Sequence, residues 1–109
     1  MAEPLFTALF GPGATQDANS VTISKTDLAA VGLTPAANNK PEAIFTAIIK
    51  QAETTLTTAN YDLNPDQSIT IENGFPDLPQ RNGVTYRRNT KTISFYKPDT
   101  QSEIDPDDY

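Results

Sequence analysis

The segment RNGVTYRRNTKTISFY, residues 81–96, decides how the sheet of this protein is built, because two tight turns compete around it. Asn82-Gly83 is the commonest kind of hairpin turn, but a strand running back from it would place Pro76 and Pro79 in a hydrogen-bonded ladder. We therefore assign Asn82-Gly83 to a wider loop that includes both prolines. The remaining turn, Asn89-Thr90, predicts a hairpin between the two halves of the segment.

The register of this hairpin explains the apolar pattern of the segment. A two-residue turn at Asn89-Thr90 places Tyr86 opposite Ile93 and Val84 opposite Phe95, so that all four side chains share one inward face. A single long strand would point the two halves to opposite faces and would need a β-bulge to correct them. The hairpin is preferred because it needs no such irregularity, although its turn lacks the usual glycine.

The principal helix is predicted over Pro41–Ala59. Asn39 has the character of an N-cap, Pro41 fits the first turn, and Glu42 stands where its side chain can return a hydrogen bond to the cap. Apolar side chains then recur at intervals of four, the pattern of a helix with one buried face: Ile44, Ile48, Ala52 and Leu56.

Alternating apolar and polar residues predict the strands of an α+β domain over residues 21–98. We expect a small, mainly antiparallel sheet with the principal α-helix packed on one face. A short helix within residues 26–32 should end at Gly32. The predicted strands are Val21–Lys25, Gln67–Glu72, Val84–Arg88 and Lys91–Lys97.

An extended N-terminal arm with a spacer, residues 1–20, and an acidic C-terminal tail, residues 99–109, flank this domain. The arm carries four apolar side chains that would line one side of a helical turn ended by Gly11: Leu5, Phe6, Leu9 and Phe10. Apolar burial alone does not offset the backbone entropy of ordering such an arm, so it should dock on its own domain or on a neighbouring subunit. The tail should be solvated or ordered by a partner, and because its charge is opposite to that of residues 81–97 it could also fold onto them in the same subunit or in the next.

Several classes of function are disfavoured by composition. The 109 residues include neither Cys nor His, which removes disulfides, thiolate chemistry, His-containing triads and nearly all zinc sites. No phosphate-binding loop motif is present, and the loop carboxylates have no spacing that fixes a catalytic pair. We therefore predict no enzyme activity, no catalytic residue, no metal and no cofactor.

The apolar start is too short and too interrupted to cross a membrane, so we expect a protein made and kept in the cytoplasm unless it joins a particle.

A basic strip stands out in a chain of net charge −6: Arg81, Arg87, Arg88, Lys91 and Lys97. Basic residues interleaved with aromatic ones are typical of single-stranded nucleic-acid binders, which is the alternative function for residues 81–97. The hairpin register turns Tyr86 and Phe95 inward, however, and leaves few rings for stacking. We expect Arg87, Arg88 and Lys91 to contact protein carboxylates instead, as partner-binding residues alongside the apolar arm.

The short apolar arm, the helix PEAIFTAIIKQAETTL, the strand QSITIE and the closing segment GVTYRRNTKTISFYKP together resemble small structural proteins of tailed phages, particularly cyanophages. The resemblance covers roughly residues 20–98 and implies a capsid cement or decoration protein, or a tail or connector component. Such a protein is a non-enzymatic part of the virion, assembled in the host cytoplasm. It would bind the major capsid protein or other shell subunits in many copies, as a homo-oligomer.

Overall fold

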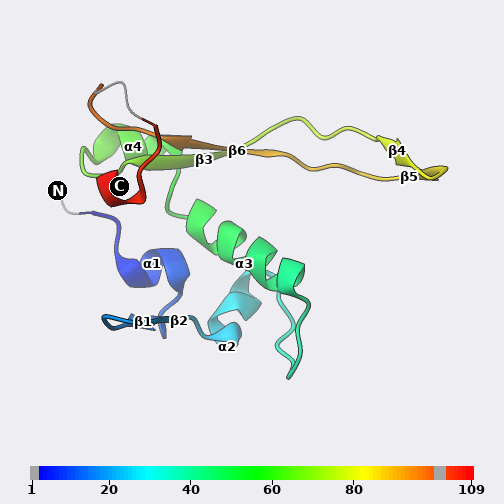
Figure 1. The fold of residues 1–109 in the computed structure, drawn as a ribbon, viewed down its shortest axis with the longest axis horizontal. Coiled ribbons are helices and arrows are strands. Elements are labelled where there is room, and N and C mark those ends of the chain that lie inside the picture. Colours follow the sequence, from blue (N-terminus) through cyan, green and yellow to red (C-terminus); the bar gives the residue numbers. More distant parts are fainter. Residues whose placement is uncertain (1–2, 100–102) are drawn as a thin grey trace.

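The residues that the computed structural model describes, 3–99 and 103–109, form four α-helices and three two-stranded antiparallel sheets, which confirms the predicted α+β class (Figure 1). Residues 1–2 of the predicted arm and 100–102 of the predicted tail lie outside this description. The elements are α1 Phe6–Phe10, β1 Thr15–Gln16, β2 Val21–Thr22, α2 Lys25–Leu28, the 3₁₀ turn η1 Ala29–Val31, α3 Pro41–Glu53, α4 Thr58–Leu63, β3 Ile69–Asn73, β4 Gln80–Arg81, β5 Val84–Thr85, β6 Lys91–Phe95 and the 3₁₀ turn η2 Pro106–Asp108.

The core lies where the end of α3 meets β3. Ala52, Leu56 and Ile71 are buried against one another, and Leu9 of α1 and Ile69 of β3 pack around them. α1 packs on α3 and α4 packs on β3, so the core is closed by short elements from distant parts of the chain. This cluster is small, and it leaves much of the chain outside the core.

α3 begins as predicted but ends earlier. Pro41 occupies the first turn, while Asn39 does not cap: its side chain accepts from Ala36 N–H and donates to the Thr34 carbonyl, which closes the preceding loop. The predicted helix to Ala59 is wrong, because α3 ends at Glu53 and α4 is a separate helix.

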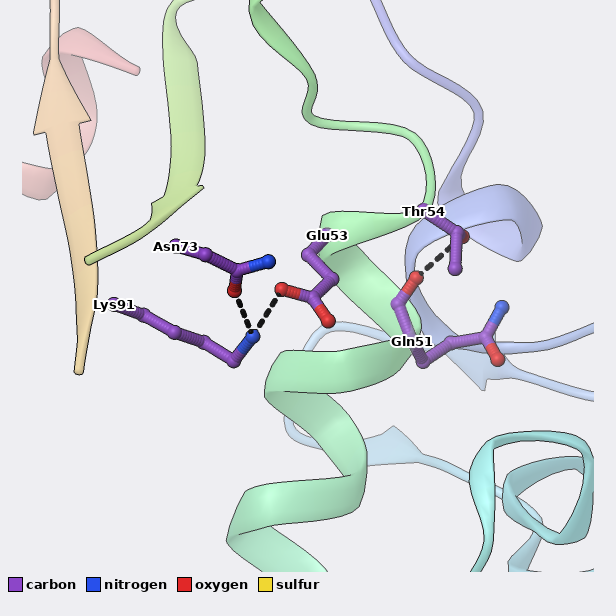
Figure 2. A network of polar contacts seen from close by, with 5 residues as sticks. All are labelled: Gln51, Glu53, Thr54, Asn73 and Lys91. Carbon is purple, nitrogen blue, oxygen red and sulfur yellow. Dashed lines mark hydrogen bonds and ion pairs between the residues drawn. The ribbon is translucent and has the colours of Figure 1, made fainter. Parts of the chain in front are cut away.

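The sequence between α3 and α4 is rich in threonine, whose hydroxyl groups compete for backbone partners. The Thr54 hydroxyl donates to the Gln51 carbonyl (Figure 2), and Thr57 caps α4 by accepting from Asn60 N–H. The Leu56 carbonyl accepts from Ile71 N–H instead of from a helix neighbour, at 2.8 Å. These bonds turn the chain from α3 to the edge of β3.

The first predicted strand does not join the main sheet. Only Val21–Thr22 of it forms a strand, which pairs with Thr15–Gln16, and Val21 is exposed. The turn between them is held by Asp17, whose carboxylate accepts from Asn19 and Ser20 N–H; these bonds lower the pKa of Asp17. The next residues form α2 and η1, which end at Gly32 with φ of 106°, so the predicted helix end there is confirmed. The predicted strand fails because its residues 24–25 enter α2.

The predicted hairpin at Asn89-Thr90 is wrong. β6 pairs with β3, with Ile93 opposite Ile71 and Phe95 opposite Ile69, whereas β5 pairs with β4. The tight turn is Asn82-Gly83, where φ is 52° and 75°, the positive values that a two-residue hairpin turn requires.

The two prolines do not prevent this hairpin. Pro79 keeps one of the two bonds of its pair with Tyr86: its carbonyl accepts from Tyr86 N–H at 2.9 Å, and only the return bond, which would need an N–H on Pro79, cannot form. Asp77 and Arg88 exchange both backbone bonds, so the nitrogen of Pro76 points away from the partner strand. Between Asn73 and Asp77 the chain has one residue more than the opposing strand, a bulge that interrupts the ladder between the sheet and the hairpin.

The acidic tail folds back on its own chain. Lys97 Nζ lies 2.9 Å from an Asp108 carboxylate oxygen, and this bond raises the pKa of Lys97. The ring of Tyr109 meets the ring of Phe95 edge-on, with centroids 5.6 Å apart. The described part of the tail is therefore ordered by β6, not simply solvated.

Candidate interaction surface

The hairpin that leaves the sheet, residues 74–90, is the most unusual surface of the molecule, and we call it the ribbon. Figure 1 shows it extending beyond α3, away from the helices. Phe75 is 96% exposed and Leu78 is 60% exposed, and Val84 and Tyr86 are exposed as well. Burying a large apolar side chain is favourable by about 1.5–3 kcal/mol, so four such side chains in solvent mark a contact surface.

Strand pairing sorts the ribbon side chains into two faces. Asp77 pairs with Arg88 and Arg81 pairs with Val84, so these four share one face with Tyr86. The Arg81 guanidinium lies 4.8 Å from the centre of the Tyr86 ring, a cation–π contact on that face. The opposite face presents Leu78, Gln80, Thr85 and Arg87. Both faces are thus basic and partly apolar.

Arg88 is held within the ribbon. Its guanidinium donates to both carboxylate oxygens of Asp77, at 2.8 and 2.5 Å. The hydrogen bond from Arg88 lowers the pKa of Asp77, and the same bond raises the pKa of Arg88. This ion pair links the two strands of the ribbon. Because Asp77 neutralises its charge, Arg88 has less charge with which to bind a partner.

Lys91 anchors the base of the ribbon to α3. Figure 2 shows its ammonium group between Glu53 and Asn73, at 2.5 Å from Glu53 Oε2 and 2.7 Å from Asn73 Oδ1. Both members of the Lys91–Glu53 pair are about three-quarters buried. Lys91 was predicted to bind a partner, but its charge is already neutralised inside the chain.

The other predicted contact residues fall into two places. Phe6, Leu9 and Phe10 are half-buried in α1, which is held to α3 by bonds from Gln51 and Thr55 to the Ala8 carbonyl. Leu5 remains 69% exposed. Arg87 stands on the ribbon and forms no ion pair with any residue in 3–99 or 103–109. The arm residues and the ribbon residues are therefore not brought together within one chain.

Sequence reasoning missed Phe75 and Leu78. The signal was present, since two large apolar side chains in a loop with two prolines have no periodic partner and no place in a core. A segment predicted to be a connecting loop gives no reason to expect its apolar side chains on a binding surface.

Across residues 3–99 and 103–109 there is no group of three acidic, His or Cys side chains that could hold a metal ion. No helix among the described residues is long and apolar enough to cross a membrane. Comparison of the chain with protein-family models, with curated proteins and with solved structures gave no match.

Proposed function

We propose that this chain is a non-enzymatic structural component of a multimeric particle, and that its ribbon binds a neighbouring subunit. The exposed apolar ribbon carries the proposal, above all Phe75 at 96% exposure. Among the described residues the core contains few large side chains, whereas exposed large apolar side chains lie on both the ribbon and the body. Repetition of a modest contact over many copies makes such a surface effective in a lattice.

The particle we propose is a tailed-phage virion, following the resemblance described above, with the chain acting as a capsid cement, decoration or shell-stabilising protein. Its partner would be the major capsid protein or another shell subunit. A projecting ribbon suits this role because it reaches across a joint between subunits while the body stays folded on its own core. A tail or connector component would use the same contact at another place in the particle.

Nucleic-acid binding by the strip is less well supported. Three of its five basic side chains already meet carboxylates, in the pairs Arg88–Asp77, Lys91–Glu53 and Lys97–Asp108. Arg81 and Arg87 remain for phosphates, and two contacts give weak binding. The ribbon is better suited to a protein surface that has both carboxylates and apolar groups.

The test is incorporation into particles. Particles assembled with a tagged copy of the chain would be separated on a gradient and analysed by quantitative mass spectrometry. We expect the chain in a fixed, repeating copy number, and we expect the F75S/L78S variant to stay in the unassembled fraction. A matched control is V21S, at an exposed apolar site on β2 away from the ribbon. Absence of the unchanged chain from purified particles would overturn the proposal.

A further inference from the structure

The charge of the molecule is divided unequally between the ribbon and the rest. Three of the eight basic residues and one of the fourteen acidic residues lie in residues 74–90. The ribbon therefore carries net +2, and the remainder of the chain carries −8. Two ribbons repel each other, whereas a ribbon and the body of a second copy attract.

An apolar hollow lies at the end of the molecule away from the ribbon tip. It has a volume of about 220 Å³ and is lined by residues of α4, of the segments on either side of α4 and of the segment before α1: Pro4, Thr55, Asn60, Leu63, Asn64 and Gln67. Leu63 is 73% exposed at this hollow, and the exposed Leu5 follows Pro4 in the chain. Figure 1 places α4 and the N-terminal segment opposite the tip formed by β4 and β5. We call this surface the end hollow.

The end hollow has acidic neighbours, just as the ribbon has basic ones. Asp62 precedes Leu63 in α4, Glu3 precedes Pro4, and both acidic residues are exposed. On the outer half of the ribbon, the exposed Val84 and Tyr86 share one face with Arg81. The two surfaces therefore match both in apolar character and in the sign of their charge.

We propose that the outer half of the ribbon of one copy docks on the end hollow of a second copy, with Val84 and Tyr86 against Leu63 and Leu5, and Arg81 beside Asp62. This inference rests on the proposed function and names its partner as another copy of this chain. Because the two surfaces differ and lie at opposite ends, each added copy leaves one ribbon and one hollow free. Such a heterologous contact builds a ring or a filament.

A charge exchange tests the pairing without disturbing the core, because Arg81 and Asp62 are both exposed. Sedimentation equilibrium and mass photometry would measure self-association of the unchanged chain, of R81E, of D62K and of the R81E/D62K double variant. We expect each single variant to associate at least about tenfold more weakly, since like charges face each other. The double variant, and an equimolar mixture of the two single variants, should regain association.

The control is E72K, which makes the same change of charge at an exposed position on β3, outside the proposed contact; its association should match that of the unchanged chain. Species larger than dimers, weakened by salt, are expected for the unchanged chain. A chain that stays monomeric at high concentration, one that stops at a dimer, or a double variant that regains nothing would overturn the inference. Any of these three results would contradict self-association alone. The proposed function is tested separately, by whether the chain enters particles in the incorporation test.

Discussion

The base of the sheet and the ribbon are consecutive parts of the same two chain segments, yet they are stabilised in different ways. At the base, β3 and β6 pair beside the buried residues Leu56 and Ile71. In the ribbon, the strands continue with cross-strand bonds and exposed side chains, and no large apolar side chain of residues 74–90 is buried. The difference separates folding from association: the base should determine whether the protein folds, and the ribbon should determine what it binds.

The largest difference between the two regions should appear on truncating one apolar side chain in each. Leu56 is 5% exposed, so L56A removes buried contacts and leaves a cavity, which should lower the free energy of unfolding by about 2–5 kcal/mol. F75A, at 96% exposure, should change it by less than about 0.5 kcal/mol. Urea denaturation followed by circular dichroism measures both. A large loss in F75A would show that the ribbon belongs to the folding core.

The turn of the ribbon should be sensitive to backbone strain and not to crowding. Gly83 has φ of 75°, and a Cβ added there meets no atom within 4 Å, so G83A tests the positive φ alone. We expect a local cost of about 1–2 kcal/mol. Amide hydrogen exchange of Tyr86 and Arg88 should then speed up by about tenfold or more, since 1.4 kcal/mol corresponds to a factor of ten.

The same experiment contains its own reference, because Ile71 N–H bonds to the Leu56 carbonyl at the base. Its exchange should be unchanged in G83A. N82D is the matched control for the turn, since Asp tolerates a positive φ nearly as well as Asn. If protection falls equally in both regions, the ribbon and the base open as one unit and the comparison is wrong.

Local rules predicted the parts of the fold that depend on neighbours in sequence. Pro41 at the start of α3 and Gly32 at the end of η1 are examples, because each has a backbone preference that acts within one turn. The end of α3 was missed, since Leu56 uses its carbonyl for Ile71, fifteen residues away. No local pattern reports such a bond.

The ribbon was missed for a related reason. Proline is excluded from central strands, but in this two-stranded ribbon Pro79 costs a single bond, because its carbonyl still accepts from Tyr86 N–H. Which side of a strand carries the bonds depends on register, and register depends on the bulge before Asp77. The exposed state of Phe75 follows from that geometry, so the candidate surface could be recognised only once the pairing was known.

The ion pair that joins the base of the ribbon to α3 should stabilise the protein by less than the buried Leu56 side chain or the turn at Gly83 does. Lys91 and Glu53 link the base of the ribbon to α3 with side chains about one-quarter exposed. A double-mutant cycle with K91M and E53Q should give a coupling free energy of about 0.5–1 kcal/mol, measured by urea denaturation. R87Q, at an exposed site, is the control and should show no effect. A coupling of zero would mean that the ribbon is oriented by its backbone alone.

The smallest effect should come from pH. The hydrogen bond from Arg88 lowers the pKa of Asp77 below its ordinary value of 3.8, so the ionised pair stabilises the ribbon at and above that pH. The contribution is lost as the pH falls through the lowered pKa, because Asp77 then takes up a proton and the pair breaks.

Titration of the Asp77 carboxyl carbon by NMR should give a higher pKa in R88Q than in the unchanged chain. With Arg88 present, ribbon amide protection should fall only below about pH 4, while Ile71 should lose less protection, since its N–H bonds to the backbone carbonyl of Leu56, which does not titrate. An unchanged Asp77 pKa in R88Q would show that the guanidinium does not act on this carboxylate, and that the ribbon is held by its backbone bonds and its turn.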